Sequence, residues 1–198
     1  VSQSLFEGAM YAFVFIWTPA LQGEASCTTP PLGWIFAAYM VALMVGSQLF
    51  ASFIQSQGPE RMAQWAFGSA ALAMLCATFA LSSRGSGCEP EAYTNITLIS
   101  FMIFEGCVGV YFPSMGTLKG KYLPERSRSS LMNVARMGLN VALVLVLLEV
   151  HRLSNSSVCF ICAVALACAL VAQTVFRNLP KQTSLPSALP ASVAPASS

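Results

Sequence analysis

The sequence predicts an all-α membrane protein with six transmembrane helices. Of its 198 residues, 56% are hydrophobic and 9% are charged, and the mean hydropathy is +0.65. A soluble domain carries roughly 25% charged residues. The apolar residues form six runs, each close to the ~20 residues with which a helix crosses a bilayer. We therefore expect a multi-pass protein embedded in the lipid bilayer.

The six runs, taken in chain order, cover residues 5–21, 32–54, 63–81, 96–118, 131–150 and 158–176. The breaks between them hold Gly, Pro, Ser and charged residues, which are typical of turns. Residues 179–198 are rich in Pro, Ser and Ala and have no apolar period, which is typical of disorder. These features predict a six-helix transmembrane domain over residues 1–178 and a disordered cytoplasmic tail over residues 179–198.

The placement of Lys and Arg predicts the orientation of these helices. Two cations, Arg84 and Arg152, lie on one side of the predicted spans, and Arg136 lies within a span. The other seven are Arg61, Lys119, Lys121, Arg126, Arg128, Arg177 and Lys181. Because cytoplasmic loops carry the excess of Lys and Arg, we expect both ends of the chain in the cytoplasm. The basic loop 119–128 is then chiefly a topology signal, or alternatively a latch acting through Glu125.

The tripeptide Phe-Glu-Gly occurs in both the first and the fourth run. Phe6-Glu7-Gly8 and Phe104-Glu105-Gly106 are each followed by aromatic residues and a proline. The second copy of this tripeptide lies in the fourth span and divides the six spans into two sets of three. Because each set crosses the membrane an odd number of times, the second set starts on the opposite side and is inverted. Inverted three-helix repeats are typical of secondary transporters and build each six-helix half of the major facilitator fold. The alternative is chance similarity between two apolar helices.

Glu7 and Glu105 are carboxylates that lie inside the first and fourth apolar runs. A charge in a membrane span is costly and marks a functional site by default. We interpret both as proton-coupling or gating residues that face a central cavity. The alternative is that each caps a neighbouring helix or hydrogen-bonds across a packed interface. Tyr11, four positions after Glu7 on the same helical face, is a candidate substrate contact.

The fifth run carries a polar stripe made of Asn133, Arg136 and Asn140. Their spacing places all three on one face of an otherwise apolar helix. A guanidinium donates bidentate hydrogen bonds from a planar fork, so this stripe suits an oxyanion substrate. The alternative is that Arg136 extends to the membrane surface or pairs with a glutamate to hold two helices together.

The remaining composition narrows the function further. The chain has one histidine, no HExxH pattern and no aspartate, so we expect no metal centre or cofactor. No catalytic pair is visible, and the net charge of +2 is too small to indicate nucleic-acid binding. Cys27 and Cys88 both lie in predicted outer loops, where an oxidising exterior permits a disulfide if the two residues lie close enough.

The chain resembles the eukaryotic molybdate-anion transporters of the major facilitator superfamily. Residues 6–21, 104–115 and 123–140 are similar to the first helix, the fourth helix, and the loop and fifth helix of the C-terminal half of those proteins. The resemblance implies molybdate uptake at the cell membrane by alternating access, with Arg136 as an anion ligand. It also implies an N-terminal six-helix half that this chain lacks. Segment 46–61 keeps only a trace of the superfamily's Gly–acid–basic gate motif.

Two other classes of function stay open. One is transport of a different small solute. The other is a membrane scaffold or nutrient sensor that keeps the fold without transporting.

Overall fold

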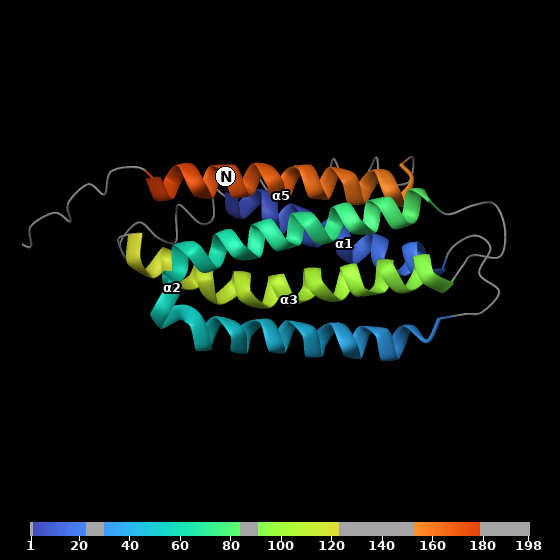
Figure 1. Ribbon diagram of the computed structural model, residues 1–198, viewed down its shortest axis with the longest axis horizontal. Coiled ribbons are helices and arrows are strands. Elements are labelled where there is room, and N and C mark those ends of the chain that lie inside the picture. Colours follow the sequence, from blue (N-terminus) through green and yellow to red (C-terminus); the bar gives the residue numbers. More distant parts are fainter. Residues whose placement is uncertain (1, 23–29, 84–90, 123–152, 179–198) are drawn as a thin grey trace, which may run out of the picture.

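The computed structural model of the chain describes residues 2–22, 30–83, 91–122 and 153–178 (Figure 1). Their secondary structure is helical throughout and consists of α1 (Ser2–Gln22), α2 (Leu32–Ser82), α3 (Glu91–Tyr122) and α5 (Asn155–Asn178). The predicted run 131–150 lies outside the described residues, together with its stripe of Asn133, Arg136 and Asn140. So do Cys27, Cys88 and the predicted tail 179–198. The structure therefore tests neither the disulfide that the outer loops permit nor the two-part domain division, which stays a prediction.

Each of the four helices is long and apolar enough to cross a membrane. α2 has 51 residues, more than twice the ~20 that one crossing needs. It is broken at Gly58, whose φ of 76° lies in a region that favours glycine, and the next residue, Pro59, has no N–H to donate to a helical ladder. The two halves of α2 correspond to the second and third predicted runs, and Figure 1 shows the chain turning back between them.

The described part of the chain is thus that of a helical membrane protein, as predicted. Five of the six predicted runs fall within described helices. The count of six and the inverted relation of the two sets stay predictions, because residues 131–150 are outside the described part.

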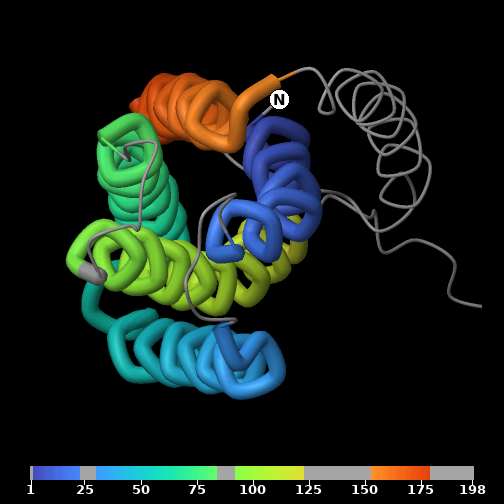
Figure 2. The backbone as a smooth tube through the Cα atoms, turned by 90° about the vertical axis from the view of Figure 1, so that its right-hand side faces the viewer, coloured from blue at the N-terminus to red at the C-terminus, as the bar shows by residue number. Residues whose placement is uncertain are grey.

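α3 is the central helix of the described part. It packs most extensively against α2, while α5 packs against both α2 and α1. Viewed along the bundle, α3 lies between the first half of α2 and the other helices (Figure 2). The core around it is aromatic, and the rings of Phe6, Phe13, Phe67, Phe101, Phe104, Tyr39 and Tyr111 are at most 1% exposed.

Glycines bring α3 unusually close to the first half of α2. A Cβ added to Gly46 would overlap the backbone carbonyl of Gly106, and one added to Gly109 would overlap that of Leu43. Ser47 Oγ lies at the same contact and donates to the carbonyl oxygen of Gly109 at 3.1 Å. Small residues that let backbones approach are typical of helix packing in membranes, where apolar burial gives no preference for a neighbouring helix over lipid.

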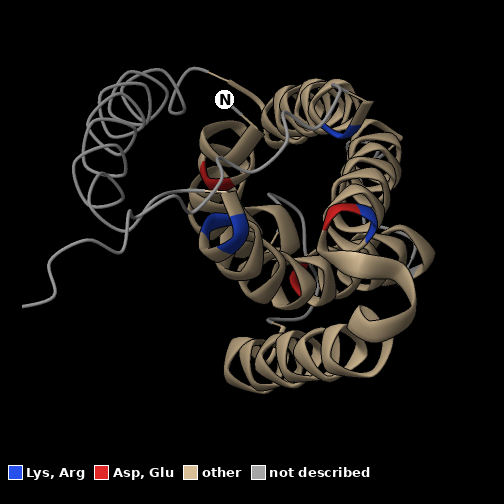
Figure 3. Cartoon of the chain, turned by 90° about the vertical axis from the view of Figure 1, so that its left-hand side faces the viewer, with Lys and Arg blue, Asp and Glu red and all other residues tan. Residues whose placement is uncertain are grey.

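The outer surface of the described helices is apolar, as expected for a lipid-facing bundle. Trp34, Trp65 and Phe79 are 83%, 71% and 69% exposed, and charged residues are sparse (Figure 3). The described cations lie near the break of α2 and in the last turns of α3 and α5. Figure 1 places these three points at the same end of the bundle. We call this the basic end.

Candidate functional site

Glu7 takes part in a hydrogen-bonded cluster between α1 and α3. Its Oε1 accepts a hydrogen bond from the Tyr111 hydroxyl at 3.1 Å and another from Gln3 Nε2 at 2.7 Å. Tyr111 is 1% exposed, so its hydroxyl needs a partner inside the protein. Glu7 supplies that partner. This is the interface hydrogen bond expected by the structural interpretation of Glu7, and it leaves the gating interpretation as a prediction.

The phenylalanines of the two Phe-Glu-Gly tripeptides contact each other in the core. The rings of Phe6 and Phe104 are stacked with centroids 6.2 Å apart. Phe6 also stacks on Tyr111 at 4.0 Å and contacts Phe67 of α2 at 5.3 Å. The repeated tripeptide therefore contributes one ring from α1 and one from α3 to a shared aromatic cluster, beside the Glu7–Tyr111 hydrogen bond.

Glu105 occupies a different and more buried setting. It is 7% exposed, and no described residue donates a hydrogen bond to its carboxylate. The neighbouring group on which its charge acts is the Tyr39 hydroxyl of α2, and this hydroxyl is itself buried without a hydrogen-bond partner. Burying a charge or a hydroxyl without a partner is costly. Glu105 and Tyr39 are thus two buried polar groups without a hydrogen-bond partner among the described residues.

Tyr11 is the predicted substrate contact that the described residues include. It is 39% exposed on α1, one helical turn from Glu7. No hydrogen bond joins it to Glu7 in the described part of the chain. Its partners in the prediction, Asn133, Arg136 and Asn140, lie outside the described residues.

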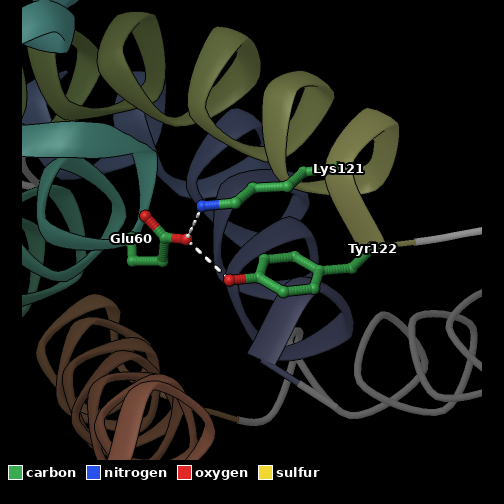
Figure 4. A network of polar contacts seen from close by, with 3 residues as sticks. All are labelled: Glu60, Lys121 and Tyr122. Atoms are coloured by element: carbon green, nitrogen blue, oxygen red, sulfur yellow. Dashed lines mark hydrogen bonds and ion pairs between the residues drawn. The ribbon is translucent and has the colours of Figure 1, made fainter. Parts of the chain in front are cut away.

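A second polar cluster ties three helices together at the basic end. Glu60 Oε1 accepts hydrogen bonds from Lys121 Nζ at 2.7 Å and from the Tyr122 hydroxyl at 2.8 Å (Figure 4). The Tyr122 ring packs edge-on against Phe176 of α5 at 5.3 Å. We call Glu60, Lys121, Tyr122 and Phe176 the basic-end latch.

The same end carries a second link between α2 and α5. Gln64 Nε2 donates to Thr174 Oγ1 at 3.0 Å, and Arg177 donates to Gln64 Oε1. The second half of α2, α3 and α5 are therefore joined by side chains as well as by packing.

The latch sets the protonation of Glu60, which lies outside the predicted spans. Partial burial raises the pKa of this carboxyl, and the hydrogen bonds from Lys121 and Tyr122 outweigh burial, so that the pKa falls to about 2. Glu60 is therefore ionised across the whole physiological range of pH. From the sequence, a latch was only the alternative role of the loop 119–128, acting through Glu125, which lies outside the described residues. The signal available in the sequence was an acid, Glu60, next to Gly58-Pro59, together with the pair Lys121-Tyr122 after the next apolar run but one.

Two tyrosines of the buried sites were also missed from sequence. Tyr111 belongs to the aromatic residues that follow the second Phe-Glu-Gly tripeptide, and Tyr39 lies in an apolar run with no charged neighbour in sequence. Only the packing of α1, α2 and α3 brings them to Glu7 and Glu105. Among the described residues, no group of His, Cys, Asp and Glu could hold a metal ion.

Comparison with known proteins gives a consistent family of relatives. Residues 1–93 match a major facilitator family model described as sugar transporters with 12 transmembrane segments. The chain is similar to the molybdate-anion transporter of Danio rerio, with 33% identity over 150 residues, which covers 75% of this chain and 30% of that protein. The Takifugu rubripes protein of the same name is 32% identical over 149 residues, again 75% of this chain and 30% of the relative.

The molybdate-anion transporter of Xenopus laevis is 29% identical over 185 residues, which covers 89% of this chain and 39% of that protein. The chain thus spans between three and four tenths of the length of these curated relatives. No solved structure matches it.

Proposed function

We propose that this chain, which belongs to the molybdate-anion transporter family of the major facilitator superfamily, mediates molybdate uptake across the cell membrane by alternating access. The observation that carries the proposal is its similarity to several molybdate-anion transporters over three quarters or more of its length. In this proposal, residues 1–178 form six helices as two inverted repeats and constitute the C-terminal half of a twelve-helix protein. The twelve segments of the matching family model support that size.

The proposed substrate contacts are Arg136, Asn133, Asn140 and Tyr11. A tetrahedral dianion loses its hydration on entering a membrane cavity, so the protein must replace it with positive charge and hydrogen-bond donors. Arg136 supplies the charge and a planar fork, the two asparagines supply amide donors, and Tyr11 supplies a hydroxyl. The exposure of Tyr11 on α1 supports its part in this set.

Glu7 and Glu105 are the proposed coupling or gating residues. Their support is their position in apolar helices and the arrangement around each of them. Glu7 is held by Tyr111 across the α1–α3 contact, and this hydrogen bond can form in one state of the transporter and break in another. Glu105 is 7% exposed on α3, and the Tyr39 hydroxyl of α2, on which its charge acts, has no hydrogen-bond partner among the described residues. A proton gained or lost at either carboxylate would change the contact that it belongs to.

The decisive experiment is uptake by cells that express the full protein. We expect molybdate accumulation that tungstate or sulfate reduces by competition. Arg136→Lys keeps the charge but loses the planar fork, so we expect weakened uptake, and Arg136→Ala should abolish it. Surface abundance is measured for each variant. Normal molybdate uptake by a well-expressed Arg136→Ala protein contradicts the role of Arg136 as an anion ligand.

A second candidate, sugar transport, is favoured by the matching family model, which describes sugar transporters. The same cells distinguish it. Uptake of a labelled hexose that molybdate does not inhibit would support sugar transport, whereas the molybdate proposal predicts none above background. Absence of uptake of either solute by a protein at the cell surface would favour a scaffold or sensor.

A further inference from the structure

An apolar groove of about 500 Å³ runs between the two halves of α2 and α3. Each of the three helical segments contributes a stripe of residues at spacings of three or four. On the first half of α2 the lining runs from Leu49 to Gln57, which is about 12 Å at the rise of an α-helix. The groove therefore follows the bundle axis from the basic end toward the middle of the membrane, as an acyl chain of one leaflet does.

The rim of this groove consists of apolar side chains that are exposed in the described part. Trp65, Phe53 and Ile103 are 71%, 50% and 49% exposed. The inner wall includes Cys107 and Ser69, which satisfy each other with an Oγ–Sγ hydrogen bond of 3.1 Å. The lining thus offers a continuous apolar surface with its polar atoms already paired. In a protein that crosses a membrane, the neighbour of such a surface is hydrocarbon.

Arg61 lies beside the lining residues Gln57 and Met62 at the basic end of the groove, and no carboxylate is paired with it in the described part. Arg61 Nη1 donates to Oε1 of the lining residue Gln57 at 3.4 Å, and an amide carries no charge. The adjacent Glu60 is held by Lys121 and Tyr122. Trp65 follows Arg61 by one helical turn. Trp is enriched at the level of lipid headgroups, and basic pockets at the cytoplasmic ends of helices bind anionic headgroups.

We propose that this groove binds one anionic phospholipid, with an acyl chain along the apolar lining and the phosphate at Arg61. The lining alone cannot select a lipid, because lipid tails are as apolar as the side chains that they meet. Selectivity comes from the charge of Arg61 at the open end. The site is separate from the proposed substrate and coupling residues, and it requires only that the chain spans a membrane.

Trp65 makes the groove accessible to a direct measurement. The full chain is reconstituted in phosphatidylcholine bilayers with Trp17→Phe and Trp34→Phe, which leaves Trp65 as the fluorophore. Phosphatidylglycerol or phosphatidylcholine with brominated acyl chains is then titrated in as the quencher. We expect the brominated phosphatidylglycerol to reach half-quenching at about one fifth of the mole fraction that phosphatidylcholine needs, the preference expected for one cation near the membrane surface.

The matched control keeps Trp34 and carries Trp17→Phe and Trp65→Phe. Trp34 is 83% exposed near the start of α2, away from the groove lining, so both brominated lipids should quench it equally. Arg61→Gln should remove the preference at Trp65, and Arg61→Lys should keep most of it. Helical content by circular dichroism shows whether each variant is folded. Equal quenching of Trp65 by the two lipids in the unsubstituted groove overturns the proposal, and so does a preference that survives Arg61→Gln.

Filling the groove tests the acyl chain separately from the headgroup. Ser69→Leu adds a side chain inside the lining, and Ser52→Leu adds the same group at an exposed position of α2 outside it. We expect Ser69→Leu to lower the limiting quenching of Trp65 by brominated phosphatidylglycerol at least twofold, and Ser52→Leu to leave it unchanged. Undiminished quenching in a folded Ser69→Leu protein contradicts an acyl chain in the groove.

Discussion

At the scale of single residues, two buried tyrosines differ in one hydrogen bond. Tyr111 donates to Glu7, whereas the Tyr39 hydroxyl has no partner, and both are 1% exposed. Removing a hydroxyl that is hydrogen-bonded costs about 1 kcal/mol, and removing one that is buried without a partner costs little or stabilises. We therefore expect Tyr111→Phe to lower the thermal midpoint of the purified protein and Tyr39→Phe to leave or raise it. A larger loss in Tyr39→Phe would contradict this assignment of hydrogen bonds.

Glu60 gives a prediction for pH. Its pKa is lowered to about 2 from an ordinary value of 4.5, so its ionised form is favoured by folding. The contribution to stability is complete above the ordinary value and is lost as the pH falls toward 2. We expect Glu60→Gln to lower the thermal midpoint by the same amount at pH 8 and at pH 5, and by less at pH 3. A difference that changes between pH 8 and pH 5 would show that another group controls the latch.

At the scale of helices, the contact between α2 and α3 depends on two glycines. An added methyl group at Gly46 or Gly109 meets backbone that cannot move aside without separating the helices. Overpacking of this kind costs about 1–3 kcal/mol. Gly116 lies on the same α3 helix with nothing within 4 Å of an added Cβ, and there Ala should stabilise by up to about 1 kcal/mol. We expect Gly46→Ala and Gly109→Ala to lower the thermal midpoint and Gly116→Ala to raise it, and equal effects would contradict the close approach.

The helices themselves were largely predictable from hydrophobic run length. The first, fourth and sixth predicted runs lie inside α1, α3 and α5, and the break at Gly58 lies between the second and third predicted runs. Run length works because every backbone polar group in hydrocarbon must be satisfied within its own helix. The helix ends were less predictable, since each described helix continues past its apolar run into polar residues.

The site was predictable only in part, because its partners come from other helices. Glu7 and Glu105 could be identified from the sequence because each is a carboxylate in an apolar run. The tyrosines beside them in the structure could not. Tyr39 has no feature in sequence that separates it from an ordinary core tyrosine, and Lys121 belonged to a loop that was interpreted chiefly as a topology signal. Pairing of this kind depends on how the helices pack, which run length does not determine.

At the scale of the whole molecule, the charge distribution predicts how the bundle sits in the membrane. The described cations Arg61, Lys119, Lys121 and Arg177 lie near the break of α2 and in the last turns of α3 and α5, which Figure 1 places at the basic end. Since positive charge is retained in the cytoplasm, the break of α2 should face the cytoplasm, and the C-terminal end of α2 should face the outside.

A pair of single cysteines tests this orientation. In a chain whose seven native cysteines are replaced by alanine, Ser83→Cys marks the end of α2 and Ser56→Cys marks its break. A membrane-impermeant maleimide added to intact cells should label Ser83→Cys and leave Ser56→Cys unlabelled. Permeabilising the cells should expose Ser56→Cys to the reagent, which controls for its reactivity. Labelling of Ser56→Cys in intact cells would invert the orientation, and with it the side of the membrane on which the latch and the lipid groove lie.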